Sequence, residues 1–454
     1  MTETIRKSSD KREMLAETVR MAWPAVLESF FMALASMIDT MMVASVGSHA
    51  VAAVGLTTQP KFIGLTPFMA MNIAVSALTA RRRGEGRKNA ANEMLMTALC
   101  STLVICAGVT AVCIAFADPI IRLCGSASDT HAEAVSYFRI IMGGTIFNVV
   151  SLIINAAQRG SGNTKIAMRT NVTSSVVNVC CNWLLIGGHM GFPALGVKGA
   201  ALATVAGTVV ACAMSAASLF GKDSFVSIPY SIHEKLGPTA EALVSMVRLG
   251  INFLVENLVM RIGFVTTAVL AAGLGTRALA AHQVGMNLLT LGFAFGDGMQ
   301  VAAVALIGRS LGEGNAESAR RYGGFAQRIG MFLSVCLAVV ILAGGRPLCR
   351  LYFSEPDIIE MGVLITRFII VILVFRISQL IFTGCLRGAG DARYTLAASI
   401  ISVTLIRSAV TLLLVKGFGW GLSGIWTGIL ADQFSRLVLN GIRFYKGKWT
   451  EVEI

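Results

Sequence analysis

The chain has 454 residues, of which 55% are hydrophobic and only 14% are charged, and its mean hydropathy is +0.71. This composition excludes an ordinary soluble globular protein and indicates that lipid is the solvent for most of the chain. The net charge of +13 does not indicate nucleic-acid binding, because the basic residues lie between apolar segments, where they report membrane topology.

Apolar stretches of about 20 residues, the length that crosses a bilayer, recur along the whole chain. Because continuous apolar segments satisfy their backbone in lipid only as helices, the pattern predicts an all-α polytopic membrane protein with about twelve transmembrane helices. No apolar segment followed by a cleavage site occurs in the first twenty residues, so no cleaved signal peptide is expected. The predicted spans, in chain order, are 22–46, 51–80, 94–117, 133–157, 166–187, 195–220, 243–272, 279–308, 325–344, 360–385, 394–416 and 419–442.

An internal repeat relates the two halves of the chain in one ungapped register across four helices, and after a three-residue shift it also pairs Gly196 with Gly421. It places VGSHAVAAVG (46–55) over LGTRALAAHQ (274–283). Since each half contains six predicted spans, both copies have the same orientation, and we predict two six-helix lobes related by a parallel repeat. The N-terminal lobe is expected over residues 1–220 and the C-terminal lobe over 239–454, joined by a cytoplasmic connector over 221–238.

The distribution of lysine and arginine predicts the orientation. The two termini and the loops on their side of the membrane carry 26 of these residues, whereas the opposite loops carry six. Cytoplasmic loops carry the excess in membrane proteins. We therefore predict a multi-pass protein of the cell membrane with both termini in the cytoplasm.

Ionisable residues inside the spans are costly in lipid and are the first functional candidates. The acids are Glu28, Asp39, Glu256, Asp297 and Asp432, and the bases are Lys61, Arg139, Arg261, Arg367, Arg376 and Arg407. The repeat pairs Glu28 with Glu256, and a duplicated charge favours a role in the common scaffold; proton relay or substrate binding stays open for both. Asp297, whose repeat partner is Met69, is expected either to pair with a buried arginine or to handle protons or substrate.

Asp39 differs from its repeat partner, Thr267, and is therefore the strongest candidate. Polar side chains three, four and seven residues apart predict one face of the span 166–187; they are Asn171, Ser174, Ser175, Asn178 and Asn182. A carboxylate surrounded by amide and hydroxyl oxygens can hold a proton or Na⁺. The alternative is that the amides only join helices, with about 0.6–2 kcal/mol for each contact. The predicted ion-coupling set is Asp39, Asn155, Asn178, Asn182 and Thr204.

No metalloprotease, Walker or nucleophile-elbow motif occurs in the chain. We therefore expect no enzyme and no cofactor apart from H⁺ or Na⁺ as a coupling ion. We also expect no metal other than Na⁺ at Asp39.

Several segments together resemble the multidrug and toxic compound extrusion (MATE) family. They are WPAVLESFFMALASMIDTMMVASVG in the first span, GTRALAAHQVG, VALIGRSLGEGN and LRGAGDA. The resemblance covers essentially the whole chain. It implies a monomer in membrane lipids that exports lipophilic, often cationic drugs and metabolites in exchange for Na⁺ or H⁺.

The resemblance also assigns roles to residues. It implies that Asp39 is the family's first-span carboxylate and that Asn178 and Thr204 are polar residues around it. Asn182 stands where some members have a second aspartate, so this chain has one titratable group fewer. Met260 stands where another branch has a glutamate about one turn after Glu256, which puts a cation site of that kind in doubt.

Two alternatives remain open at this stage, and a third is excluded. A lipid-linked saccharide flippase of the same superfamily would carry an anionic cargo, which the interior arginines would suit. A channel or membrane scaffold is a second alternative, although no segment resembles a selectivity filter. The major facilitator fold also has parallel six-span repeats, but the loop ARRRGEGRK lacks the acidic residue expected there.

Overall fold

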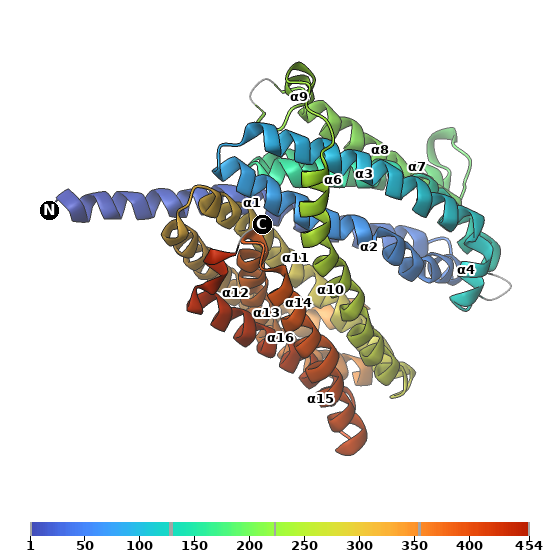
Figure 1. Ribbon diagram of the computed structural model, residues 1–454. Coiled ribbons are helices and arrows are strands. Elements are labelled where there is room, and N and C mark those ends of the chain that lie inside the picture. Colours follow the sequence, from blue (N-terminus) through green and yellow to red (C-terminus); the bar gives the residue numbers. More distant parts are fainter. Residues whose placement is uncertain (1, 127–129, 222–223, 353–355, 453–454) are drawn as a thin grey trace. The chain divides into compact units, whose positions relative to one another are not determined.

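The computed structural model describes residues 2–126, 130–221, 224–352 and 356–452, and every regular element in these ranges is a helix (Figure 1). In chain order the elements are α1 (Thr2–Ala44), α2 (Ser48–Gly84), α3 (Lys88–Ala115), α4 (Ala117–Leu123), α5 (His131–Gly143), α6 (Thr145–Gly160), α7 (Thr164–Gly187), the 3₁₀ helix η1 (His189–Gly191), α8 (Val197–Ser218), α9 (Ile228–His233), α10 (Ala240–Ala272), α11 (Thr276–Gly312), α12 (Ala316–Tyr352), α13 (Pro356–Gly388), α14 (Ala392–Ser399), the π-helix η2 (Ile400–Arg407), α15 (Ser408–Leu412), the π-helix η3 (Leu413–Gly417), α16 (Gly421–Lys446) and the 3₁₀ helix η4 (Lys448–Glu451).

The predicted all-α membrane fold is confirmed, and each predicted span falls on a helix or on consecutive helices. Nine helices of the described residues are long and apolar enough to cross a bilayer, or ten if the bent pair α5 and α6 forms one span. α7 and α16 coincide with two further predicted spans but are not among these ten. Both carry polar faces, which are the faces of greatest functional interest.

The chain divides into two compact units, and each is described by itself. The N-terminal unit is Phe30–Gly250, and the C-terminal unit combines Met1–Ser29 with Ile251–Ile454. The lobe boundaries predicted from the sequence stay a prediction.

In the N-terminal unit, small residues bring the helices that carry the polar face close together. The Ser174 hydroxyl on α7 donates a hydrogen bond to the Gly207 carbonyl on α8 at 2.7 Å. A Cβ atom at Gly207 would lie 2.8 Å from the Ser174 carbonyl oxygen, and one at Gly199 would lie 2.5 Å from that of Leu185. Such close approach of small residues is how membrane helices gain packing energy without a hydrophobic driving force.

The C-terminal unit packs α11 and α12 against α13 in the same manner. A Cβ atom at Gly296 would meet the Leu380 side chain at 2.6 Å, and one at Gly330 would meet Ile381 at 2.1 Å. Ile381, together with Met299 and Phe382, belongs to a buried apolar core. Directly after α14 the chain continues as the wider π-helix η2, which ends at Arg407. π-helical turns of this kind are frequent at functional sites.

Candidate functional site

Four of the five predicted ion-coupling residues form one chain of hydrogen bonds. The Asn182 side-chain amide on α7 donates to Asp39 Oδ1 on α1 at 2.5 Å. The same Asn182 nitrogen lies 3.5 Å from Asn178 Oδ1, and the Asn178 amide donates to Thr204 Oγ1 on α8 at 3.3 Å. The chain therefore links α1, α7 and α8 within the N-terminal unit.

Local structure explains why these side chains meet. Asn178 and Asn182 are one helical turn apart and lie on the same face of α7. The close approach of α7 and α8 at Gly207 brings Thr204, three residues earlier, within reach of Asn178. The Thr204 hydroxyl in turn donates to the Ala200 carbonyl at 2.9 Å, so its oxygen is held in place.

The site has unused acceptor oxygens. Asn182 is completely buried, and its Oδ1 atom has no hydrogen-bond partner among the described residues. Asp39 is half-buried, and Asn182 is the one donor whose hydrogen bond it accepts in the described part of the chain. A buried acceptor without a partner costs about 1–3 kcal/mol. A proton or a hard cation supplies what these oxygens lack.

Two neighbours of Asp39 were not assigned to the site from the sequence. Lys61 on α2 and Tyr137 on α5 lie close enough to interact electrostatically with Asp39. No ion pair within 4.0 Å joins Lys61 to Asp39 in the described structure, so the two charges face each other at longer range. Lys61 was visible as an interior base, but Tyr137 gave no signal because a buried aromatic residue is ordinary in a helix.

Asn155, the fifth predicted residue, does not join the chain. It is buried in α6, and its amide donates to Ser151 Oγ, one turn earlier on the same helix, at 3.4 Å. Its Oδ1 atom also has no hydrogen-bond partner among the described residues. Ser174 of the predicted polar face holds α7 against α8, as described above, and so serves packing.

The Glu256 carboxylate joins three helices of the C-terminal unit. It is 1% exposed and accepts hydrogen bonds from Ser399 at 2.7 Å and Thr395 at 3.5 Å. Arg387 on α13 forms an ion pair with it at 3.0 Å. The carboxylate thus ties α10 to α13 and α14. Glu28, its repeat partner, is also buried and lies in the part of α1 that belongs to this unit.

The interior of the C-terminal unit contains a buried network centred on Asp432. Arg436 binds both carboxylate oxygens, at 2.9 Å and 3.0 Å, and Gln433 donates to one of them at 2.8 Å. Arg407 lies 3.7 Å from the same carboxylate and donates from Nε to Thr267 Oγ1 at 2.9 Å. Arg436 is itself buried, within the predicted span 419–442.

The expected close pair of Asp297 with an arginine is not formed. Asp297 lies on α11, and in the described residues no arginine nitrogen lies within 4.0 Å of it. Arg376 and Arg387 nevertheless interact with it electrostatically at longer range. The Arg376 guanidinium lies over the Phe293 ring, 4.3 Å from its centre. The buried pair of an acid with an arginine that the sequence predicts for Asp297 is formed by Asp432 instead.

Comparison with known proteins agrees with this architecture. The MatE family model matches residues 24–184 and 253–413. The second match begins almost where the register of the internal repeat places the start of the first, so the repeat predicts this duplication. Together the two matches cover well over half of the chain.

Similar proteins match over nearly their full length. The chain is 27% identical to the "Probable multidrug resistance protein NorM" of Thermotoga maritima, over 96% of this chain and 93% of that one. It is 26% identical to the "Multidrug resistance protein MdtK" of Yersinia enterocolitica, over 96% and 95%. Among solved structures, an outward-facing multidrug resistance MATE family transporter of the MOP superfamily superposes with a TM-score of 0.88 at 23% identity, over 96% and 97% of the two chains.

Proposed function

The chain belongs to the MatE family, and from this premise we propose that it is a secondary active multidrug exporter. It exchanges lipophilic, cationic compounds for H⁺ or Na⁺ by alternating access. The names of the Thermotoga and Yersinia relatives as multidrug resistance proteins support the cargo class. It works as a monomer in the cell membrane with both termini in the cytoplasm, an orientation that the excess of basic residues on one side supports.

The hydrogen-bonded chain at Asp39 is the observation that carries the coupling proposal. Its carboxylate and the unpartnered Asn182 oxygen provide acceptors inside a membrane-spanning unit, where an uncompensated negative charge is costly. Binding of H⁺ or Na⁺ neutralises Asp39 and lowers the cost of moving it during a conformational change. An ion shifts such an equilibrium only by binding one conformation better than the other. Rearrangement of the Asp39–Asn182 contact provides that difference.

The interior arginines give little support to an anionic cargo. In the C-terminal unit Arg407, an interior arginine of the sequence analysis, shares Asp432 with Arg436, and Arg387 is paired with Glu256, so these three side chains already have carboxylate partners. The multidrug names of the relatives also favour drug export over saccharide flipping. We therefore do not retain the flippase as a second proposal.

An exchange assay in proteoliposomes tests the proposal. Purified full-length protein is reconstituted with a fluorescent aromatic cation inside, and inward Na⁺ and H⁺ gradients are imposed separately. We expect dye release under at least one gradient and none in protein-free vesicles. No release under either gradient, with correctly folded protein in the bilayer, would contradict gradient-driven export of cations. The gradient that works identifies the coupling ion.

A further inference from the structure

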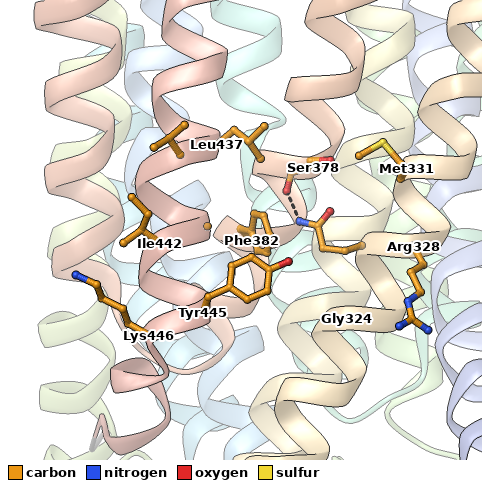
Figure 2. Close-up of a pocket in the computed structure, with 12 residues that line it drawn as sticks. Gly324, Arg328, Met331, Ser378, Phe382, Leu437, Ile442, Tyr445 and Lys446 are labelled. Atoms are coloured by element: carbon orange, nitrogen blue, oxygen red, sulfur yellow. Dashed lines mark hydrogen bonds between the residues drawn. The ribbon is translucent and has the colours of Figure 1, made fainter.

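A groove on the C-terminal unit lies apart from the polar and charged site residues discussed above. It is formed by α12, α13 and α16 and has a volume of about 1020 Å³ (Figure 2). Ligand pockets for drug-sized molecules have volumes of about 300–1,000 Å³, so the groove is large enough for an elongated amphiphile. Its floor is fixed where the Gln327 amide on α12 donates to the Ser378 carbonyl on α13 at 2.8 Å.

One end of the groove is apolar. Figure 2 shows Met331 and Leu437 at this end, with Phe382 and Ile442 further along. Met331 is 44% exposed and Ile442 is 47% exposed, so the apolar lining is open. In a membrane-spanning unit such a lining faces hydrocarbon and accepts an acyl chain at no cost in desolvated polar groups.

The other end is basic. Arg328 on α12 and Lys446 at the end of α16 are exposed, and no carboxylate in the described residues lies within 4.0 Å of either charge. The Arg328 guanidinium lies over the ring of Phe325, 5.8 Å from its centre. This contact does not neutralise the positive charge of Arg328. Tyr445, which is 78% exposed, lies between the two basic side chains (Figure 2).

We place this basic end near the boundary between membrane and water, because α16 ends at Lys446 itself. Exposed tyrosine is typical of the headgroup level of a bilayer, and long basic side chains extend toward that level from the ends of helices. The groove therefore runs from headgroup depth at Lys446 toward hydrocarbon depth at Leu437.

We propose that this groove is a binding site for an anionic phospholipid. The phosphate lies at the basic end, where Arg328 and Lys446 provide the positive charges, the glycerol backbone lies beside Tyr445, and one acyl chain follows Ile442 toward Leu437. The charge complements the lipid at one end, and the apolar lining complements it at the other. Each basic residue near a membrane surface attracts anionic lipid, and two together favour it over a zwitterionic lipid by on the order of tenfold.

The test is a titration of the purified full-length protein in neutral detergent, followed by native mass spectrometry. Phosphatidylglycerol is compared with phosphatidylcholine of identical acyl chains, and inorganic phosphate is added as a competitor. We expect one phosphatidylglycerol to be retained on the order of tenfold more tightly than phosphatidylcholine, and phosphate not to displace it. Equal retention of the two lipids would overturn the proposal, as would displacement by phosphate or by a cationic dye.

Variants locate the binding. Arg328→Gln with Lys446→Gln removes both charges and should bring the affinity for phosphatidylglycerol down to that for phosphatidylcholine. The control, Lys165→Gln with Arg169→Gln, removes two exposed basic residues on α7 in the N-terminal unit and should change nothing. Unchanged preference in the first variant, or its loss in the control, would exclude the groove.

A third variant blocks the groove without changing charge. A Cβ atom at Gly324 would have no heavy atom within 4 Å, so Gly324→Leu fits the fold and places its side chain in the groove. We expect it to weaken retention of both lipids while the thermal unfolding temperature stays as in the parent protein. A folded Gly324→Leu protein that retains phosphatidylglycerol as the parent does would contradict the site, even if the double-charge variant failed to fold.

Discussion

The two units make the same contact between helices with different chemistry. In the N-terminal unit Asn182 donates to Asp39 at 2.5 Å, and in the C-terminal unit Arg407 donates to Thr267 at 2.9 Å. The register of the repeat pairs Thr267 with Asp39, and the slightly shifted register that pairs Gly421 with Gly196 also pairs Arg407 with Asn182. An acid and an amide in one unit thus correspond to a hydroxyl and a guanidinium in the other.

The difference lies in how far each contact is satisfied. In the same shifted register Asp432 corresponds to Gly207, so the C-terminal unit supplies an acid that compensates Arg407 where the N-terminal unit has no side chain. Asp39 has a single amide donor, beside an amide oxygen with no partner among the described residues. A carboxylate that two guanidinium groups compensate stabilises one structure, whereas a carboxylate with a single amide donor can respond to an ion. We infer that coupling belongs to the N-terminal unit and scaffolding to the C-terminal unit.

The largest effect should follow from Asp39→Asn. The variant keeps the volume of the side chain and imitates its neutral state, so an ion no longer changes its charge. We expect gradient-driven dye exchange in proteoliposomes to be abolished while the amount of folded protein in the membrane is unchanged. Full exchange by this variant would remove Asp39 from the mechanism and transfer attention to Glu256 and Asp297.

Asp39→Asn should abolish exchange without affecting folding. Asp432→Asn should instead cause a large loss of stability. It leaves Arg436 and Arg407 buried without their carboxylate, and breaking a buried ion pair costs about 3–5 kcal/mol. We expect a clearly lower thermal unfolding temperature in detergent. Replacing Arg436 with Met in the same protein should recover part of the loss, because it removes one uncompensated charge. An Asp432→Asn protein of parental stability would contradict the scaffold role.

The sequence predicts where the helices lie and, of the two contacts compared, the one at Asp39 in the N-terminal unit. Long apolar segments and an ungapped repeat determine where helices lie, and a spacing of four residues puts Asn178 and Asn182 on one face. Asp39 has Thr267 as its repeat partner and is the unmatched acid that accompanies a polar helix face, which identifies it as the candidate carboxylate. These signals are local or come from comparing the two halves, and neither needs knowledge of tertiary packing.

The sequence does not predict the pairing inside the C-terminal unit. Asp432 and Arg436 are four residues apart, a visible helical pair, but no sequence pattern shows that Arg407, on another helix, shares the same carboxylate. Pairing across helices depends on how each helix is rotated about its axis, which an apolar pattern fixes only roughly. For that reason Asp297 was expected beside an arginine, and Lys61 and Tyr137 were not expected beside Asp39.

A smaller effect should follow from Asn178→Ala, which removes the link between Asn182 and Thr204. Hydrogen bonds between membrane helices contribute about 0.6 kcal/mol on average, equivalent to about a threefold change in an equilibrium constant. We expect the ion concentration for half-maximal exchange to rise by about this factor, with the maximal rate little changed. Ser174→Ala is the matched control, because it removes a packing bond of α7 and should leave the ion dependence unchanged. An equal shift in both variants would indicate a general effect of helix packing.

The smallest effect should follow from Asp118→Asn, the comparison that separates a coupling acid from an ordinary one in the same unit. Asp118 lies on the short helix α4, where the hydrogen bond from His131 Nε2 at 2.8 Å, assisted by Arg122 at 3.0 Å, holds its pKa below the usual range. A carboxylate with a lowered pKa in the folded state contributes stability above its unfolded pKa and loses it as the pH falls through the folded value. That loss is confined to pH values below about 4, so Asp118 stays charged across the range in which transport is measured.

We therefore expect Asp118→Asn to keep the parental pH profile of dye exchange between pH 5.5 and 8.5, roughly the range around neutrality in which a buried carboxylate with a perturbed pKa can titrate. If Asp118→Asn altered that profile and Asp39→Asn did not, the acid that senses the gradient would lie at the exposed end of α4, and the assignment of coupling to the amide chain on α7 would be wrong.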